Sequence, residues 1–332
     1  MKKAILGVGG AIVVALLGGA LYAMNMKPAQ RPASTEKIEA TPARLERGRY
    51  LTEVVIGCTG CHSEFDTAVF SMPPKAEGAG KGGLCFTREN VGFPGVVCAQ
   101  NITSDKETGI GSWTDGEVLR AIREGVDRNG NALFPMMPYQ DLRNLSDEDT
   151  KSVVAYVRTF APVKRQNPPG HVDFPVSFFI KFAPRPLEGP VQEPNRKDTI
   201  AYGKYLSGSC IDCHSPVDEH MQRKAGLEFS GGRDFDLSKI VPGLHQRSAN
   251  LTPDETGLKA MTRENFIGAF RAFRDPAILS EKVPTGNNTL MPWIQFSKMT
   301  DEDLGAIYDY LRSVPPIQNA VERRPRPVGA KT

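Results

Sequence analysis

The chain has 332 residues, with 41 basic and 38 acidic side chains and a formal net charge of +3. This near balance of charge argues against a protein that binds nucleic acid or another polyanion through its overall electrostatics. With 40% hydrophobic and 24% charged residues the composition is globular rather than disordered, and the length allows two domains.

The first 26 residues are typical of an export or anchoring segment. Lys2 and Lys3 precede an uncharged stretch over 4–26 that is rich in Ala, Val, Leu, Ile and Gly. Ala20 and Ala23 are small enough for signal-peptidase cleavage, yet the stretch is also long enough to cross a bilayer as one helix. We favour an uncleaved transmembrane anchor, because the apolar run exceeds an ordinary signal core. The cationic start then places the rest of the chain across the membrane, outside the cytoplasm.

A sequence repeat with an offset of roughly 150 residues organises the remainder of the chain. The order of the matching segments is kept throughout, so we predict two homologous domains, at 40–160 and 195–316, followed by a basic C-terminal tail at 317–332. The matches pair Gly48-Arg49-Tyr50-Leu51 with Gly203-Lys204-Tyr205-Leu206, Asn101-Ile102-Thr103 with Asn250-Leu251-Thr252, Met137-Pro138 with Met291-Pro292, and Leu145-Ser146-Asp147-Glu148-Asp149 with Met299-Thr300-Asp301-Glu302-Asp303.

Short helices account for the regular structure that we predict within each repeat. Hydrophobic residues recur at helical spacing after each predicted N-terminal cap, and the helices that begin at Ser146 and Thr300 stop before a proline. No convincing series of alternating strands is present, so the predicted fold class is all-α. The predicted caps pair Thr114 with Glu117, Ser146 with Asp149, and Thr300 with Asp303.

The stretch 161–194 between the repeats contains eight prolines, which deny it a regular helix or a central strand. We interpret it as a Pro-rich linker strap. Phe174, Phe178, Phe179 and Phe182 argue against a simple flexible linker, because exposed aromatic rings are costly. We expect these rings to pin the strap to a domain face, with docking to a partner as the alternative.

Each repeat carries a Cys-x-x-Cys-His segment. Residues three apart share a face of a helical turn, so both thiols reach the vinyl groups on one edge of a haem, and the following imidazole lies beneath the iron. A redox-active cysteine pair would want a βαβ context, a zinc site would want further ligands, and chance would not place two such segments at equivalent positions. We therefore predict two covalently attached haem c groups. The attachment residues are Cys58, Cys61 and His62 in the first repeat and Cys210, Cys213 and His214 in the second.

A methionine follows each of these segments and is the predicted sixth ligand of each iron. Met137 lies 75 positions after His62, and Met291 lies 77 positions after His214. The proline after each methionine disfavours helix at the methionine and presents it from an extended loop. A Met ligand raises the potential relative to a second His and closes the iron, which describes an electron carrier. Ordinary packing is the alternative role for both methionines.

Other candidate ligands fit the repeat less well. Met136 competes with Met137, but Leu290 stands at the equivalent place in the second repeat. His171 lies in the strap, and His220 and His245 have no counterparts in the first repeat. For these three histidines we expect exposed polar roles.

Cys85 and Cys98 are the two cysteines outside these segments, and both lie in a loop of the first repeat. Outside the cytoplasm we expect a disulfide between them rather than two free thiols. A thiolate ligand to the first iron, which would lower its potential, is the alternative.

Together these segments resemble bacterial di-haem c-type cytochromes, similar to the cytochrome c subunits of membrane-bound alcohol and gluconate dehydrogenases. The resemblance covers most of 40–316 and implies two tandem cytochrome c-like domains with His62/Met137 and His214/Met291 as axial pairs. Those subunits commonly carry three haem motifs and this chain has two, so the dehydrogenase partner stays open. The residues that carry the resemblance are Cys58-Thr59-Gly60-Cys61-His62, Asn101-Ile102-Thr103, Thr108-Gly109-Ile110-Gly111-Ser112-Trp113, Met137-Pro138-Tyr139 and Tyr156-Val157-Arg158.

The resemblance implies a membrane-tethered electron-transfer protein of the respiratory chain rather than an enzyme. The expected location is the periplasmic side of the bacterial inner membrane, or the periplasm if the N-terminal segment is cleaved. The expected partners are the membrane, a dehydrogenase or quinol-oxidising complex, and an acceptor such as a terminal oxidase or another cytochrome, without nucleic acid. The alternative is a di-haem redox enzyme, similar to a peroxidase or a thiosulfate dehydrogenase, and a third hypothesis is a purely structural haem-bearing subunit.

Overall fold

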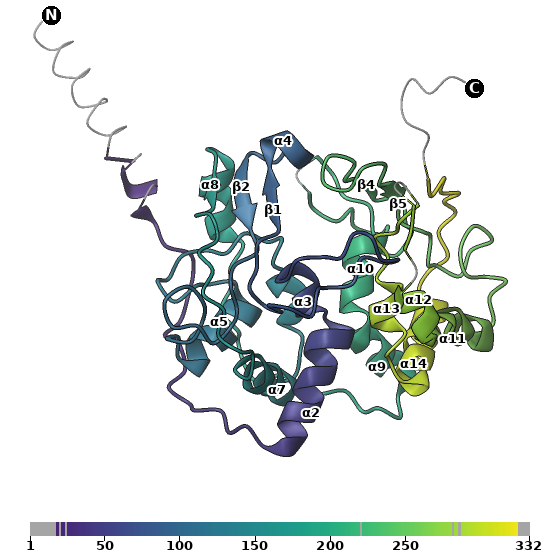
Figure 1. Cartoon of the computed structure of the whole chain (residues 1–332), viewed down its shortest axis with the longest axis horizontal. Helices are drawn as coiled ribbons and strands as arrows, with labels where there is room; N and C mark the ends of the chain where they lie inside the picture. The colour runs from purple at the N-terminus through teal and green to yellow at the C-terminus, as the bar shows by residue number, and fades with distance from the viewer. Residues whose placement is uncertain are drawn as a thin grey trace, which may run out of the picture. The chain divides into compact units, whose positions relative to one another are not determined.

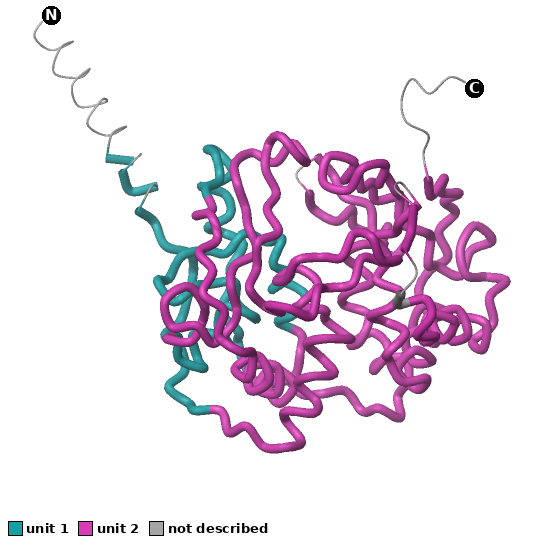
Figure 2. The backbone as a smooth tube through the Cα atoms, viewed as in Figure 1, with its two compact units in different colours: residues 1–37, 113–143, 171–189 teal, residues 38–112, 144–170, 190–332 magenta. Residues whose placement is uncertain are grey.

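The computed structural model describes residues 18–19, 21–23, 25–219, 221–280, 282–284 and 287–324. The chain divides into two compact units, which Figure 2 colours separately. Unit 1 comprises Met1–Lys37, Trp113–Arg143 and His171–Gly189, and unit 2 comprises Ile38–Ser112, Asn144–Gly170 and Pro190–Thr332. Each unit combines segments that are distant in sequence. The domain bounds 40–160 and 195–316 therefore stay a prediction from the sequence.

Two helix pairs form the frame of unit 2. Helix α2 (Pro42–Tyr50) packs on α7 (Asp147–Val157), and α9 (Thr199–Leu206) packs on α14 (Asp301–Ser313) (Figure 1). Gly48 and Gly203 lie at the two crossings, where a Cβ atom would collide with the carbonyl oxygens of Ser152 and Ala306. The equivalent glycines therefore let the helix backbones touch. The buried side chains of this frame include Leu51, Val153, Val154, Leu206, Leu304 and Leu311.

The predicted N-terminal caps are confirmed. The hydroxyl of Ser146 accepts a hydrogen bond from the amide of Asp149 at the start of α7, and Thr300 does the same with Asp303 for α14. In unit 1, the side chain of Thr114 caps α5 (Asp115–Glu124) in a reciprocal capping box with Glu117. These caps satisfy amide groups that a helix start leaves without an intrahelical partner.

The predicted all-α fold class is wrong, because two small antiparallel sheets are present. In one, β1 (Cys85–Thr87) pairs with β2 (Gly95–Cys98), and in the other β4 (Asp234–Asp236) pairs with β5 (His245–Arg247). Strands of three or four residues are too short for a clear hydrophobic alternation, and β4 and β5 are largely polar. The hairpins therefore leave little trace in the sequence pattern.

The remaining elements are short. In unit 2 they are η1, a π-helix over Leu51–Val55, α3 (Cys58–Cys61), α4 (Arg88–Val91), α10 (Gly208–His214), α11 (Arg263–Arg271), η3 (Ala272–Arg274), α12 (Pro276–Ser280) and α13 (Trp293–Phe296). In unit 1 they are α6 (Tyr139–Leu142), β3 (His171–Val172), α8 (Val176–Phe179) and η2 (Ile180–Phe182).

The proline-rich strap contains one helical stretch, so the prediction that it lacks regular helix is wrong over α8 and η2. Pro175 stands at the N-cap of α8, where a proline costs no helical hydrogen bond, and the next proline is Pro184. The rings of Phe174, Phe179 and Phe182 are exposed. The prediction that the aromatic rings pin the strap to a domain face is therefore wrong for these three.

The predicted N-terminal transmembrane helix or signal segment, 1–26, falls mostly outside the described residues, as does the basic tail beyond residue 324. Within the described residues, no helix has both the length and the apolar character that crossing a lipid bilayer requires.

Candidate functional site

The first Cys-x-x-Cys-His segment forms one turn of helix, α3, as the sequence predicts. Gly57 caps this turn with φ = 75°, a left-handed conformation that favours glycine. Cys58 and Cys61 are free thiols, and His62 follows at the C-cap. Burial raises the pKa of Cys58 to about 12, so this thiol stays protonated at neutral pH until it is bonded.

The second segment ends helix α10 in the same way. Cys210 and Cys213 are again free thiols, and His214 is the last residue of the helix. Burial raises the pKa of Cys210 to about 12, as it does for its counterpart in the first repeat. Both repeats therefore present two unbonded sulfurs and one imidazole from a single helical turn, the arrangement that covalent haem attachment needs.

The two histidines have equivalent hydrogen-bond partners, a backbone carbonyl just before the Asn-x-Thr match of each repeat. The Nδ1 atom of His62 lies 2.7 Å from the carbonyl oxygen of Gln100, and Nδ1 of His214 lies 2.7 Å from that of Ala249. A carbonyl oxygen only accepts, so Nδ1 carries the proton and Nε2 keeps a lone pair for a metal. Burial also lowers the pKa of both imidazoles, which favours this neutral form. The residues therefore fit a haem iron on Nε2.

The Asn-x-Thr matches of the sequence repeat brace the loops behind these histidines. Thr103 donates its hydroxyl to the side-chain oxygen of Asn101 at 2.6 Å, and Thr252 donates to Asn250 at 2.8 Å. The Nδ2 group of each asparagine donates to a backbone carbonyl just beyond its own repeat, that of Val163 at 2.7 Å and that of Ile317 at 2.8 Å. Each loop is thus tied to the segment that follows the last helix of its repeat.

The two methionines lie in equivalent turns. The amide of Tyr139 donates to the carbonyl of Met137 at 2.7 Å, and the amide of Trp293 donates to that of Met291 at 2.8 Å. Met137 is half-buried, whereas its neighbour Met136 is 39% exposed, which favours Met137 as the inward-facing sulfur. Met137 belongs to unit 1 and His62 to unit 2, so their pairing stays a prediction, and ligation by Met291 is likewise untested.

The Met291 turn is held by the first repeat through Asn288, a buried residue that the sequence analysis missed. Its Nδ2 donates to the carbonyls of Thr67 and Val69 at 3.0 and 2.9 Å, and its Oδ1 accepts from the amide of Ser71 at 2.9 Å. The hydroxyl of Ser71 in turn donates to the carbonyl of Met291 at 2.8 Å. We call these contacts the Asn288 clamp.

Residues close to the two haem-attachment segments are hydrogen-bonded across the repeat boundary. Ser209 donates its hydroxyl to the carbonyl of Val55 at 2.8 Å, and Gln295 donates its Nε2 to the carbonyl of Val54 at 2.9 Å. A Cβ atom on Gly57 would collide with the Gln295 amide, so glycine is needed here for space as well as for its φ. The sequence gives no signal for these contacts.

Electrostatics supports the same proximity. Desolvation and, after it, the charge of Asp212 raise the pKa of Cys61, although Asp212 belongs to the other Cys-x-x-Cys-His segment. The two segments are therefore close enough for a charge on one to act on the other.

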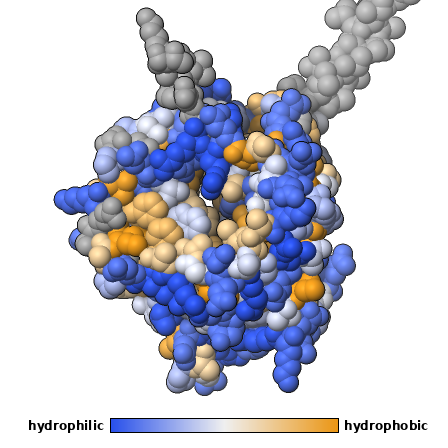
Figure 3. Space-filling model, turned by 90° about the vertical axis from the view of Figure 1, so that its right-hand side faces the viewer, coloured by the Kyte–Doolittle hydropathy of each residue, from blue (hydrophilic) through white to orange (hydrophobic). Residues whose placement is uncertain are grey.

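An aromatic wall borders the Met291 turn. The ring of Trp293 lies 5.1 Å from those of both Phe270 and Phe273, and Phe273 stacks on Phe70 at 5.3 Å. Figure 3 shows hydrophobic residues gathered around a hollow on the side of the molecule that carries α11 to α14. Apolar walls around a hollow suit a porphyrin ring, most of which is hydrophobic.

The structure describes both of the other cysteines and two of the other three histidines. Cys85 and Cys98 form a disulfide, as predicted, which leaves neither sulfur as a thiolate ligand. His171 is exposed and lies 3.8 Å from Asp173, and Nε2 of His245 lies 2.7 Å from Asp234. His220 lies outside the described residues.

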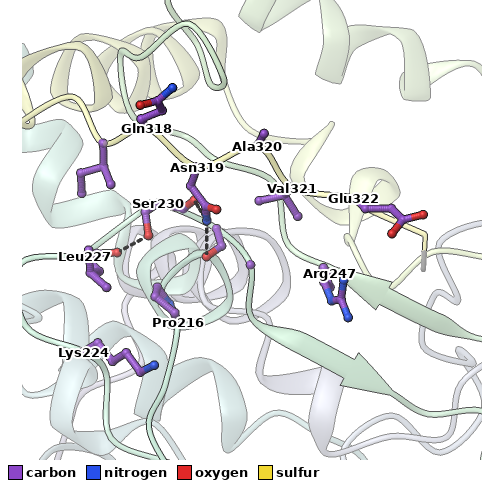
Figure 4. A pocket seen from close by; sticks show the side chains of 13 residues that line it. Pro216, Lys224, Leu227, Ser230, Arg247, Gln318, Asn319, Ala320, Val321 and Glu322 are labelled. Atoms are coloured by element: carbon purple, nitrogen blue, oxygen red, sulfur yellow. Dashed lines mark hydrogen bonds between the residues drawn. The ribbon is translucent and has the colours of Figure 1, made fainter. Parts of the chain in front are cut away.

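A separate pocket of about 480 Å³ lies between the loop after His214 and the C-terminal segment (Figure 4). Asn319 donates to the carbonyl of Ser230 at 2.9 Å on its wall, and Lys224 and Arg247 line its rim. Its lining, as far as the chain is described, includes none of the cysteines, histidines or methionines predicted to hold haem. The pocket is therefore not the haem site.

Comparison with known proteins finds several c-type cytochromes. The chain is 29% identical over 300 residues to the gluconate 2-dehydrogenase cytochrome c subunit of Pantoea cypripedii, covering 83% of this chain and 60% of that protein. It is 29% identical over 292 residues to the cytochrome c subunit of the quinone alcohol dehydrogenase of Gluconacetobacter polyoxogenes, covering 84% and 58%. It is 26% identical over 274 residues to a "diheme cytochrome c-type" protein of Cereibacter sphaeroides, covering 79% and 83%. No protein-family model matches.

These similarities confirm the resemblance predicted from the haem motifs. They also confirm the expectation of an electron-transfer protein or subunit rather than an enzyme, and they imply covalently bound haem c. The chain spans about three fifths of the length of the two dehydrogenase subunits.

Proposed function

We propose that the chain binds two haem c groups and carries electrons between a dehydrogenase or quinol-oxidising complex and a downstream acceptor such as a terminal oxidase. When bound, haem c supplies reversible one-electron oxidation and reduction at its iron. The observation that carries the proposal is the pair of equivalent Cys-x-x-Cys-His turns, each with two free thiols and an imidazole whose Nδ1 is bonded to a backbone carbonyl.

The chain's own residues perform three tasks in this proposal. The cysteine thiols hold each porphyrin covalently, and the two histidines supply Nε2 because their Nδ1 protons are bonded to backbone carbonyls. Met137 and Met291 supply the thioether ligands, which raise the potential and close the position that a substrate would need. Ser209, next to the second attachment segment, and Gln295 of α13 hold the carbonyls of Val55 and Val54 just before the first segment, which keeps the path between the two sites constant.

The decisive experiment is a pyridine haemochrome assay followed by a redox titration of the purified chain. We expect two covalent haems per polypeptide and two one-electron steps in the potential range of His/Met ligation. Cyanide and peroxide should leave the spectrum unchanged. Fewer than two haems, a low-potential bis-His pair, or a haem that binds cyanide readily would contradict the proposal, and the last result would favour a di-haem redox enzyme.

Substitution of adjacent methionines gives a matched test of the first axial ligand. Met137→Leu should lower the potential of one step and abolish the charge-transfer band of a methionine-bound ferric haem. Met136→Leu is the control and should change neither. If both variants behave like the native protein, Met137 is a packing residue, and if Met136→Leu alone changes the spectrum, the ligand has been assigned to the wrong residue.

The proposed location is the periplasmic side of the bacterial inner membrane, or the periplasm if the N-terminal segment is removed. The uncharged stretch over 4–26 after two lysines supports export. Membrane fractionation with N-terminal sequencing distinguishes the two forms, and a cytoplasmic chain would contradict both. Purification in mild detergent should recover a dehydrogenase with the chain, in keeping with the dehydrogenase complexes named for its relatives.

A further inference from the structure

The strap of unit 1 exposes a cluster of phenylalanine rings that no described part of the protein covers. Phe174 is 81% exposed, Phe179 62% and Phe182 56%. Phe178, which is half-buried, joins two of these rings, with centroid distances of 5.6 Å to Phe179 and 5.2 Å to Phe182. We call Phe174, Phe179 and Phe182 the aromatic face. Exposed rings grouped in this way are typical of a surface that contacts a membrane or another molecule.

The aromatic face adjoins the end of the apolar N-terminal stretch. The Nζ group of Lys181, between the second and third exposed rings, donates to the carbonyl of Ala23 at 2.8 Å. Leu21 and Tyr22 are also exposed, by 60% and 71%. In Figure 1, α8 and the described part of the N-terminal stretch lie on the same side of unit 1, which Figure 2 shows in one colour.

The segment that follows the apolar stretch is tied down on the same unit. Lys27 donates to the side chain of Asn131 at 2.6 Å, and Arg31 bonds the buried carboxylate of Glu124 at 2.7 Å. The described end of the apolar stretch, at Ala23, therefore lies beside the aromatic face on unit 1.

We propose that the aromatic face docks on the surface of the lipid bilayer, with its rings in the interfacial layer. The apolar stretch of uncharged sequence beside it identifies lipid as the occupant, because a bilayer accepts such a stretch and aromatic rings collect at its boundary. The exposed Arg185 supplies a cationic end to meet anionic headgroups. This inference rests on the proposed membrane location and adds a second point of contact.

A photo-crosslinking experiment on the full chain tests this docking. The photoreactive residue p-benzoylphenylalanine replaces Phe179 in one variant and Leu227, a 37% exposed residue of unit 2, in the control. Both are bound to vesicles of phosphatidylethanolamine and phosphatidylglycerol and illuminated, and lipid adducts on the peptides are found by mass spectrometry. An unchanged thermal unfolding midpoint verifies that each variant folds.

We expect a lipid adduct at position 179 and none at 227. A chain that sediments with the vesicles but has no lipid adduct at 179 overturns the docking, as does an adduct at 179 to a second copy or to another protein. A chain that does not bind vesicles at all overturns both the docking and the membrane location. The haem count of the same sample separates either failure from a failure of the electron-transfer proposal.

Discussion

The two hairpins occupy equivalent positions in their repeats, between the haem-binding segment and the Asn-x-Thr turn, but different chemistry closes them. In the first hairpin the register pairs Cys85 with Cys98, and a disulfide joins them. In the second, Asp234 pairs with Arg247 and also lies 2.7 Å from Nε2 of His245. A covalent link is unaffected by salt and pH, whereas an exposed ion pair is weakened by both. One repeat therefore depends on oxidising conditions where the other depends on charge.

The helix crossings are the feature that the repeats share most closely, and they should be the most sensitive to substitution. Gly48→Ala and Gly203→Ala each force a methyl group into a carbonyl oxygen of the partner helix. We expect each to lower the free energy of unfolding by about 3 kcal/mol. Denaturant titration measures this loss. Gly268→Ala in α11, where a methyl group meets nothing within 4 Å, is the control and should be neutral or slightly stabilising. A much larger loss of unfolding free energy in one glycine variant than in the other would show that the two helix crossings are not equivalent.

Removal of the disulfide should destabilise the first hairpin and leave the second unchanged. The disulfide closes a loop with a sequence separation of 13 residues, so we expect the Cys85→Ser/Cys98→Ser variant to lose about 3 kcal/mol of stability. A mild reductant should reproduce the loss in the native protein. Hydrogen exchange should quicken in β1 and β2 and stay unchanged in β4 and β5. Equal quickening in both hairpins would show that the disulfide stabilises the whole chain rather than its own repeat.

The Asn288 clamp should distinguish the two haem sites, because Phe134 stands at the equivalent position of the first repeat. Asn288→Ala leaves the buried amide of Ser71 and the carbonyls of Thr67 and Val69 without their partner. We expect a loss of about 2 kcal/mol in unfolding free energy. In a redox titration, only the potential assigned to the Met291 site should shift. A shift of both potentials, or of neither, would contradict a role specific to that site.

Two reciprocal tyrosine–aspartate contacts join the repeats. They differ in whether the aspartate has a second side-chain donor. Tyr50 donates to Asp303 at 2.6 Å, and Tyr205 donates to Asp149 at 2.6 Å. Asp149 also receives two hydrogen bonds from Arg47, whereas the described residues provide Asp303 with no second side-chain donor. Tyr50→Phe should therefore cost about 2 kcal/mol of stability and Tyr205→Phe about 1 kcal/mol. Equal losses in denaturant titration would show that Arg47 does not compensate.

The same phenols predict a loss of stability at alkaline pH. Burial and then the neighbouring carboxylate raise the pKa of Tyr50 and of Tyr205, so the folded state keeps protons that the unfolded state loses near pH ~10. The free energy of unfolding should therefore fall as the pH rises above about 10. The Tyr50→Phe/Tyr205→Phe variant should show a shallower fall. An unchanged slope would assign the alkaline loss to other groups.

The smallest effect is expected at the second hairpin. Asp234→Asn removes an exposed ion pair with His245 and Arg247, so we expect a loss of less than about 1 kcal/mol that disappears in high salt. The measurement is denaturant titration at low and high ionic strength. A loss as large as that of the disulfide would mean that charge closes this hairpin as firmly as a covalent bond does.

The sequence predicts the features that depend on neighbouring residues. The caps at Ser146 and Thr300 and the Cys-x-x-Cys-His turns arise from short patterns that the repeat reinforces, and the disulfide follows from Cys85 and Cys98 being the two cysteines left over in a chain expected outside the cytoplasm. The hairpins escape notice because their strands are short and partly polar. The exposed strap rings were misjudged because burial is the usual fate of an aromatic ring, and the sequence does not show what lies beside the strap.

The contacts between the repeats could not be predicted for a different reason. Tyr50 and Asp303 are separated by 253 positions, and Gln295 and Val54 by 241. Nothing in either local pattern selects the other partner. Such pairs form only when the helix pair α2/α7 packs against the helix pair α9/α14. They therefore depend on the folded unit as a whole and not on any one segment.

The reciprocity of the tyrosine contacts has a consequence for how the chain tolerates being cut. Each half contributes one phenol and one acid to the other half, as identical subunits do across a twofold axis. The C-terminal fragment alone would leave Asp303, at the start of α14, without its phenol donor, whereas Asp149 of the N-terminal fragment would lose Tyr205 and keep Arg47. A single proteolytic nick in the exposed stretch 188–190 should therefore leave two pieces that stay associated, which makes the chain a natural candidate for split-protein reassembly.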